Sequence, residues 1–248
     1  MNKWIYFFIT IVFLFKTTLI KSEVRFATQE FAPFHYKING VVSGPVADII
    51  RVICKDMKIK YSLTSLPWPR AQKYVKEGSM HGMFIVGWNE ERTKWLYFSP
   101  PVFNTEYGFF VKDDSKYKFN NPSWIENLTI GVYGPSNTSK SLRKISDKFK
   151  NVKIDMTPHD EAPFKKLSLG RVHAVFSNRD VGYALAKKNG LMNIKYVGRE
   201  KKLKYYIVFS KKYNDKKFID KFNRTYLKLC KKGVISKIIR NYSLEPAM

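Results

Sequence analysis

The side chain with the clearest capacity to bind an anion is that of Arg92. It lies in the stretch WNEERTK, where Asn89 can cap a short helix and Arg92 falls in the first turn. A cation at a helix N-terminus opposes the helix dipole, so folding alone does not favour arginine there. A guanidinium can hydrogen-bond both oxygens of a carboxylate. We therefore expect Arg92 to bind a carboxylate, with a surface ion pair to Glu90 or Glu91 as the alternative.

A second polar group lies in the stretch YGPSNTSKS, just before a predicted helix. Ser136, Asn137 and Thr138 combine hydroxyl and amide side chains with the free N–H groups of a helix start, and such a start can bind an anion. The same residues can equally serve as an ordinary helix cap. The residues alone leave both roles open.

Several aromatic residues accompany these polar groups. Phe31 lies in the loop QEFAPFHY, and Trp68 begins the helix pattern WPRAQKYVKEG. An aromatic ring can stack on a ligand, but most such rings lie in a core, which is where Phe34 and Trp88 are expected. Arg70, just inside the same helix, could face either a cleft or water.

Metal and cofactor chemistry finds no support in the sequence. The four histidines and the two cysteines, Cys54 and Cys230, show no metal-ligand spacing, so we expect no metal and no cofactor. The sequence also lacks a phosphate loop and a nucleophile elbow. Two cysteines are too few for a disulfide scaffold, and free thiols and a single disulfide both stay open.

The chain is strongly basic, with a formal net charge of +25. Such a charge can serve the binding of nucleic acid or of an anionic surface. The lysines are scattered, however, and they gather on helix faces such as SKKYNDKKFIDKF, without a basic region followed by heptads. A solvated, lysine-rich surface is therefore the favoured interpretation, and no nucleic-acid partner is expected.

The first 22 residues have the layout of a secretory signal peptide. Lys3 gives a positive start, residues 4–15 are apolar apart from Thr10, and Lys16 closes the run. Ser22 supplies a small residue where cleavage can occur. The run is shorter than the ~20 residues that span a bilayer. No cysteine follows it, so we expect export without a lipid anchor.

Strand and helix patterns alternate through the rest of the chain, which predicts parallel sheets with helices on their faces. The polar stretch SKYKFNNPSW separates two such α/β units, and the second is complete by about Arg199. The helices of the C-terminal tail must then pack on the first unit. We expect two lobes, residues 23–110 with 205–248 and residues 111–204, joined by two extended crossings that form a hinge beside a ligand cleft.

Four stretches, taken in order, resemble the family 3 extracellular solute-binding proteins of the polar amino-acid type, which serve ABC transporters. The resemblance covers nearly all of the chain after residue 22. It implies an α/β, two-lobed periplasmic-binding-protein fold of type II, a periplasmic location and an ABC permease as partner; a monomer is the simplest expectation. The stretches are RFATQEFAPFHYKINGVVSGPVADIIRVI, LPWPRAQKYVKEGSMHGMFIVGWNEERTKWLYFSPPVFNTEYGFFV, LTIGVYGPSNTSKSL and LCKKGVISKIIRNY.

The resemblance also implies that Arg92 binds the carboxylate of the ligand and that Phe31 and Trp68 stack on it. Two positions depart from the family pattern: Gly87 stands where the family has Thr or Ser, and Asn178 where it has an acidic residue. We therefore expect a small polar ligand that bears a carboxylate, an amino acid or a related compound. The expected ligand-binding residues are Gln29, Phe31, Trp68, Arg70, Gly87, Asn89, Arg92, Ser136, Asn137, Thr138 and Asn178.

An enzyme on the same scaffold is one alternative, because a few proteins of this family are dehydratases of cyclohexadienyl acids. Such chemistry needs an acid or a base in the cleft, and Glu30 and Asp180 are the nearest candidates. Neither lies in a catalytic motif, so a binding protein is the favoured prediction. A ligand sensor is the other alternative, and it would need a signalling domain or a second membrane segment.

Overall fold

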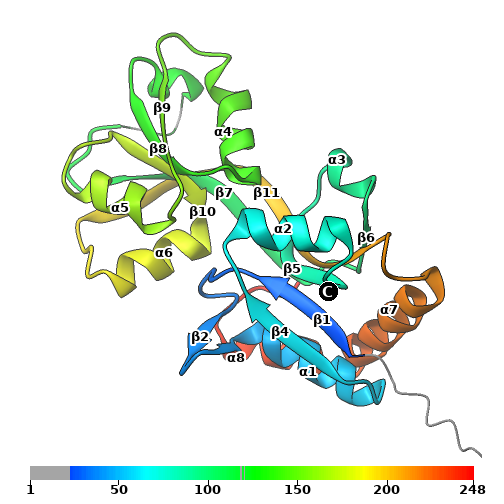
Figure 1. Cartoon of the computed structure of the whole chain (residues 1–248). Coiled ribbons are helices and arrows are strands. Elements are labelled where there is room, and N and C mark those ends of the chain that lie inside the picture. Colours follow the sequence, from blue (N-terminus) through cyan, green and yellow to red (C-terminus); the bar gives the residue numbers. More distant parts are fainter. Residues whose placement is uncertain (1–22, 118, 120) are drawn as a thin grey trace, which may run out of the picture.

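The computed structural model describes residues 23–117, 119 and 121–248. The expected signal peptide, residues 1–22, lies outside the described residues. Two α/β lobes lie one above the other, and two long antiparallel strands run from one lobe into the other (Figure 1). These strands are β7 (Phe103–Lys112) and β11 (Ile194–Ser210).

The strands of the first lobe form a sheet with parallel central strands and a separate hairpin. They are β1 (Val24–Thr28), β2 (Tyr36–Ile38), β3 (Val41–Ser43), β4 (Tyr61–Ser65), β5 (Gly82–Gly87) and β6 (Leu96–Phe98). β1 lies between β4 and β5 and is parallel to both. β11 continues the sheet beyond β5 in the antiparallel direction and also pairs with β6. β2 and β3 form a separate hairpin.

The helices of the first lobe cover both faces of this sheet. They are α1 (Pro45–Asp56), α2 (Trp68–Glu77), α3 (Glu90–Thr93), α7 (Lys216–Lys231) and α8 (Val234–Asn241). α1 packs with α7 and α8 below the sheet in the view of Figure 1, and α2 packs on β1 and β5 above it. Ile49, Ile50 and Ile53 of α1 are fully buried, and their helical spacing places them on one apolar face.

The second lobe repeats the same plan. Its remaining elements are η1 (Pro122–Ile125), β8 (Thr129–Tyr133), α4 (Asn137–Ser146), β9 (Lys153–Thr157), α5 (Glu161–Ser168), β10 (Ala174–Asn178) and α6 (Arg179–Lys188). β8 lies between β9 and β10, parallel to both, and β7 pairs with β10 in the antiparallel direction. Phe109 of β7 and Phe176 of β10 meet in the core of this lobe, with ring centroids 4.9 Å apart.

Helix boundaries follow the local chemistry of the sequence. Pro45 begins α1, at the position where a missing N–H group has no effect. Gly78 ends α2 with a left-handed φ of 84°, a conformation that glycine adopts without strain. Asn89 caps the short helix α3 by accepting a hydrogen bond from the N–H group of Arg92, as predicted.

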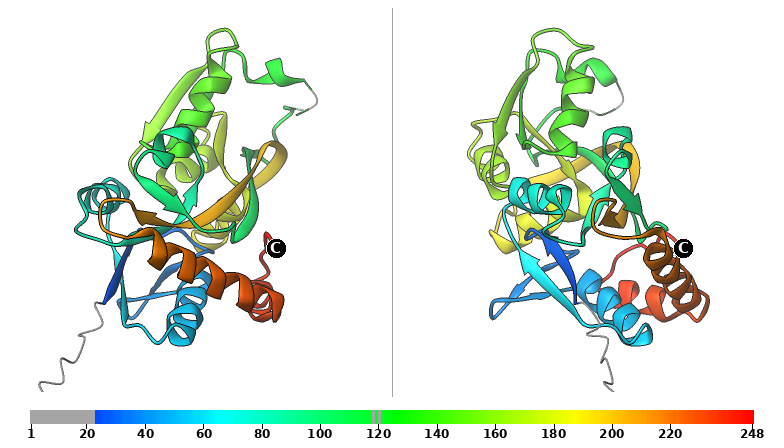
Figure 2. Two further views of the ribbon diagram at one scale, coloured as in Figure 1. Left: turned by 90° about the vertical axis from the view of Figure 1, so that its right-hand side faces the viewer. Right: turned by 45° about the vertical axis from the view of Figure 1, so that its right-hand side comes forward.

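The strand β11 differs from the sequence-based prediction. The second unit was expected to be complete by about Arg199, but the segments IKYVG and KYYIVFS, before and after that residue, lie in one strand of 17 residues. The charged stretch between them pairs with β7, which offers a continuous row of backbone partners (Figure 2). Two register shifts, at Tyr196/Gly198 and Arg199/Lys201, increase the local bend. The two lobe sheets are therefore continuous through β7 and β11.

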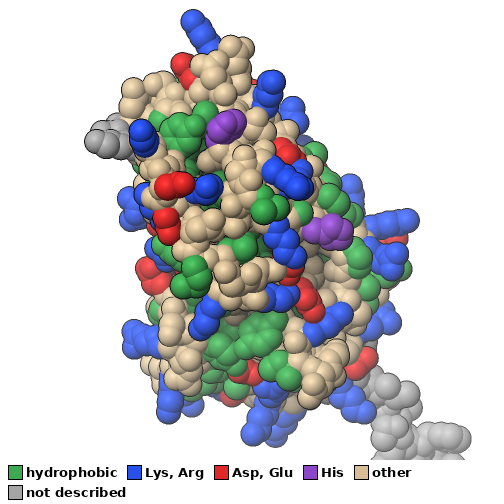
Figure 3. All heavy atoms as spheres, turned by 90° about the vertical axis from the view of Figure 1, so that its left-hand side faces the viewer, with side chains coloured by type: hydrophobic (Ala, Val, Ile, Leu, Met, Phe, Trp, Pro, Cys, Tyr) green, Lys and Arg blue, Asp and Glu red, His purple; other side chains and the backbone are tan. Residues whose placement is uncertain are grey.

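The surface shows no concentrated basic patch on the face drawn in Figure 3. Lys and Arg side chains are spread over this whole face and stand among Asp and Glu side chains. Cys54 and Cys230 are both free. Within the described part of the chain, no group of three or more His, Cys, Asp or Glu residues could hold a metal ion. The helices described here also lack the length and apolar content needed to cross a bilayer.

Candidate functional site

A cavity of about 420 Å³, partly open to solvent, lies between the two lobes; we call it the central cavity. Eight of the expected site residues line it: Gln29, Phe31, Trp68, Gly87, Arg92, Ser136, Asn137 and Thr138. An adjoining space of about 570 Å³, the side cavity, is lined by Asn89. Arg92, Ser136 and Asn137 line both cavities. Most of the expected residues are therefore brought together, and they come from both lobes.

Arg92 is the most unusual group in this site. Arg92 is only 7% exposed. Its Nη1 donates a hydrogen bond to the carbonyl oxygen of Gly87 at 2.7 Å. The guanidinium carbon lies 5.7 Å from the centre of the Trp68 ring. Burial lowers the pKa of Arg92 from its usual value. Among the described residues, no carboxylate lies within ion-pairing distance of it, and Glu91 pairs instead with Lys140 at 2.9 Å.

The start of α4 presents free N–H groups to the same cavity. The Ser136 hydroxyl accepts from the N–H group of Ser139 at 3.1 Å, and the Ser139 hydroxyl accepts from that of Ser136 at 3.0 Å. The first intrahelical bond runs from the N–H group of Lys140 to the Ser136 carbonyl. The N–H groups of Asn137 and Thr138 precede that bond, so they are available to an anion.

Aromatic rings form the remaining wall. The Phe31 ring stacks on Phe34 at 6.0 Å and meets the edge of Tyr205 at 6.1 Å. Phe34 is fully buried, as expected of a core residue. Trp88 is 58% exposed, so its expected core position was wrong. Its strand ends at Gly87, and the side chain therefore lies beyond the packed sheet.

The strand that carries Gly87 is bent just before it reaches the cavity. Val86 pairs with Tyr206 and Phe84 with Ile207, so Ile85 is the extra residue of a β-bulge. Ile85 has a φ of 58°, which is a strained conformation for a β-branched residue, and it lines the central cavity. Backbone strain of this kind is concentrated at binding sites, where the surrounding structure holds it in place.

Three tyrosines outside the expected set also line the central cavity. They are Tyr107 on β7, Tyr133 at the end of β8 and Tyr205 on β11. The Tyr133 hydroxyl donates to Gln29 Oε1 at 2.9 Å and so connects the two lobes. Their positions on the expected crossings and at the carboxyl end of a parallel strand were the available signal. His35, buried at 2% exposure, lines the cavity as well.

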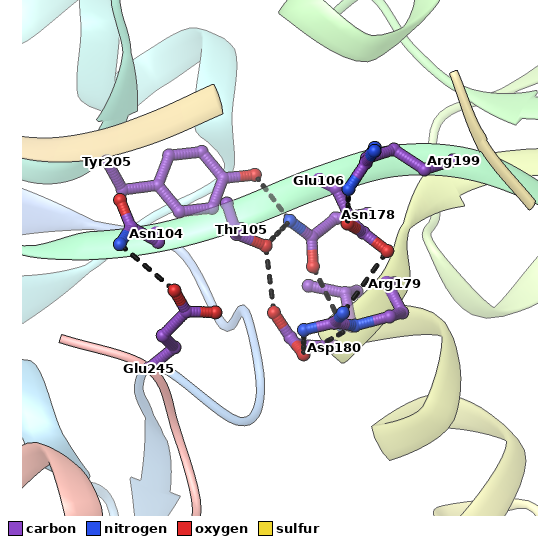
Figure 4. Close-up of polar contacts among 10 residues, drawn as sticks. Asn104, Thr105, Glu106, Asn178, Arg179, Asp180, Arg199, Tyr205 and Glu245 are labelled. Atoms are coloured by element: carbon purple, nitrogen blue, oxygen red, sulfur yellow. Dashed lines mark hydrogen bonds and ion pairs between the residues drawn. The ribbon is translucent and has the colours of Figure 1, made fainter. Parts of the chain in front are cut away.

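Two expected site residues line neither cavity. Arg70 is exposed on α2. Asn178 is buried at the end of β10, where its Nδ2 donates to the Thr105 hydroxyl at 2.6 Å and to the Tyr205 hydroxyl at 3.2 Å (Figure 4). Its Oδ1 accepts from the N–H group of Val181 and caps α6. Asn178 therefore does not line the cavity itself but hydrogen-bonds to Tyr205, which does.

A carboxyl group outside the predicted set lies within electrostatic reach of the cavity. Burial, with a further effect of the Glu161 charge, raises the pKa of Asp160 to about 7. Burial raises the pKa values of Tyr133 and Tyr205, and the charge of Asp160 raises both further.

The ionisation of Asp160 should make stability fall as pH rises. With a pKa of 3.8 in the unfolded chain and about 7 in the folded one, the folded state binds more protons between these values. Between pH 5 and pH 7.5 the native protein should lose about 2 kcal/mol more stability than Asp160→Asn. Melting temperatures at both pH values test this, with Asp147→Asn in the same lobe as control. Equal pH profiles for all three proteins would contradict it.

The family model described as "Bacterial extracellular solute-binding proteins, family 3" matches residues 24–245. The chain belongs to this family. The resemblance found in the sequence is thereby confirmed, and so is the mixed α/β periplasmic-binding-protein fold.

Individual relatives of this family 3 protein are distant. YxeM of Bacillus subtilis (strain 168), a probable amino-acid-binding protein, is 26% identical over 223 residues, which cover 88% of this chain and 83% of the relative. The octopine-binding periplasmic protein of Rhizobium meliloti is 25% identical over 210 residues, which cover 72% and 68%. A histidine kinase sensor domain with similarity to periplasmic binding proteins has a TM-score of 0.81 at 18% identity, covering 90% of this chain and 98% of that one. That likeness shows the fold alone.

The family consists of solute-binding proteins, and YxeM and the octopine-binding protein are named as binding proteins. This agrees with the prediction of a binding protein rather than an enzyme. The two acid–base candidates are also poorly suited to catalysis. Glu30 is exposed. Asp180 accepts from the Thr105 hydroxyl at 2.8 Å and pairs with Arg179 at 3.2 Å, so its carboxylate is already engaged.

Proposed function

We propose that this family 3 protein captures a small polar solute that bears a carboxylate, an amino acid or a related compound, and delivers it to the permease of an ABC transporter. The observation that carries the proposal is the state of Arg92. Its guanidinium is buried in the central cavity and has no carboxylate partner among the described residues. Burying a charge without a partner is unfavourable, and a carboxylate ligand would supply the missing one.

The proposed site draws on both lobes. Arg92 offers a guanidinium from the first lobe, the start of α4 offers N–H groups from the second, and the rings of Phe31 and Trp68 lie against the apolar part of the ligand. Contacts that form only when the lobes approach each other shift the population towards the closed state. The moving bodies are then the two lobes, expected at residues 23–110 with 205–248 and at residues 111–204. β7 and β11, which pair with strands of both lobes, form the hinge.

The relatives support the class of ligand and the location. One is named as a probable amino-acid-binding protein, and another as a periplasmic protein. The proposal accordingly includes export to the periplasm by residues 1–22, without a lipid anchor. The working form is a monomer that meets its ligand and its permease, with no nucleic acid involved.

A melting screen of residues 23–248 with amino acids and small organic acids is expected to reveal at least one stabilising carboxylate. A ligand that binds only the folded state adds about 2.7 kcal/mol at a hundred times its Kd, which raises the melting temperature by about 5–10 °C. The amide or alcohol analogue of each hit is the matched control and should give a much smaller shift. A full screen without any carboxylate-dependent shift would contradict the proposed function.

A further inference from the structure

Gly87 of the first lobe and the side-chain amide of Asn137 of the second lobe lie very close together. A side chain at position 87 would collide with that amide. A Cβ atom placed on Gly87 would lie 2.9 Å from Nδ2 of Asn137. The backbone at Gly87 is outside the left-handed region, so its conformation does not require glycine. A side chain at position 87 would therefore compete with the Asn137 amide for the same space.

Three hydrogen bonds join four residues, and the close approach of the first and the last closes them into a ring. The Arg92 side chain donates to the Gly87 carbonyl at 2.7 Å, and the N–H group of Arg92 donates to Asn89 Oδ1 at 2.9 Å. Asn89 Nδ2 then donates to Asn137 Oδ1 at 3.2 Å, from the first lobe to the second. The Asn137 amide nitrogen, lying over Gly87, closes the ring. The ring also stands where the central and side cavities adjoin.

We infer that Gly87 and Asn137 are a matched pair that sets how tightly the lobes close over the anion site. The inference rests on the proposed function and deepens it. A carboxylate on Arg92 meets a guanidinium from the first lobe and the Asn137 amide from the second, because Gly87 leaves room for that amide. The anion therefore gains a donor only in the closed state, and this difference drives closure.

Any side chain at position 87 should displace the Asn137 amide. The amide is the free end of a side chain, so it can rotate away, and in doing so it gives up its bond to Asn89. Gly87→Ala should weaken binding of the carboxylate found in the screen about fivefold, the equivalent of one hydrogen bond of about 1 kcal/mol. When Asn137 is replaced by alanine, the next atom near a Cβ at position 87 is a ring carbon of Tyr205 at 3.9 Å. An alanine at position 87 therefore fits without a clash in that background.

The test is a double-mutant cycle of Gly87→Ala and Asn137→Ala measured by titration calorimetry. Asn137→Ala alone should also weaken binding, and Gly87→Ala should add no further loss in that background. Equal losses from Gly87→Ala in both backgrounds would overturn the pairing, as would unchanged affinity in the Gly87→Ala protein. Melting curves without ligand check that all four proteins fold.

A ligand-free measurement separates this inference from the proposed function. Small-angle X-ray scattering should show more widely open lobes in the Gly87→Ala protein than in the native protein. In the Asn137→Ala background, adding Gly87→Ala should cause no further opening. If no carboxylate binds the native protein, the proposed function fails, and the scattering comparison still decides the pairing. Identical scattering from the native and Gly87→Ala proteins would then overturn it.

Discussion

Replacing Arg92 with alanine is expected to weaken binding of the carboxylate ligand by about a hundredfold or more. The guanidinium is the charged partner that the site offers to the ligand, and among the described residues it has no competing carboxylate. Removing one partner of a buried charge pair costs about 3 kcal/mol, which corresponds to this loss of affinity. Titration calorimetry with the best ligand of the melting screen measures it directly.

Arg70→Ala is the matched control for that experiment. It removes the same kind of side chain from an exposed position on α2 that lines neither cavity. Its affinity should equal that of the native protein. Arg92→Lys should bind with intermediate affinity, because an ammonium keeps the charge but loses the two-pronged geometry. An Arg92→Ala protein that binds as tightly as Arg70→Ala would remove the central support for the proposed site.

Without ligand, the Arg92→Ala protein should fold normally. A buried guanidinium that lacks a counter-ion does not stabilise the apo protein by charge pairing, and the substitution removes one hydrogen bond to the Gly87 carbonyl. Its apo melting temperature should therefore stay close to that of the native protein. This property distinguishes a lost binding contact from a lost fold.

The features that the sequence predicts well are those that neighbouring residues decide. Pro45 begins α1 and Gly78 ends α2 because the backbone demands of these two residues are local. Asn89 caps α3 for the same reason. The spacing of apolar residues then places the helices against the sheets. Together with the alternation of elements, these signals were sufficient to predict the α/β class.

The features that the sequence misses depend on partners far along the chain. The charged residues in the middle of β11 resemble a loop, and only pairing with β7, which lies some ninety residues earlier, makes them a strand. Ile85 carries no local mark of a cavity wall, and the only signal at Tyr133 is its place at the carboxyl end of a strand. Their roles arise from a bulge against β11 and from a hydrogen bond to Gln29 across the lobes.

Asn178 shows how such a distant partner can reverse an interpretation. Its amide lacks the charge of the acidic residue expected at this position, yet both ends of that amide form supporting hydrogen bonds within the protein. The Thr105 hydroxyl accepts from Asn178 and donates to Asp180, so an acceptor-only group at position 178 would leave Thr105 without its donor. The carboxylates of this region are instead those of Asp180 and Glu106, which both pair with Arg179.

Asn178→Ala is accordingly expected to give the largest loss of stability among single substitutions near the site. The change removes the cap of α6, at a cost of about 1 kcal/mol. It also leaves the hydroxyls of Thr105 and Tyr205 short of a buried partner, at a cost of about 2 kcal/mol. The sum lowers the melting temperature of a chain of this length by about 6–12 °C. Calorimetry of the ligand-free protein measures the change.

An asparagine-to-alanine substitution at the C-terminal end of α6 provides the control. Asn189→Ala removes one hydrogen bond, from Nδ2 to the carbonyl of Leu185, and should cost less than about 1 kcal/mol. Asn178→Asp tests the donor requirement, because a carboxylate keeps the shape and the cap but cannot donate to Thr105 or Tyr205. It should be unstable at neutral pH and recover in acid, where a protonated carboxyl donates again. A neutral-pH melting temperature equal to that of the native protein would show that the amide donor is dispensable and that the carboxylate beside Asp180 is tolerated.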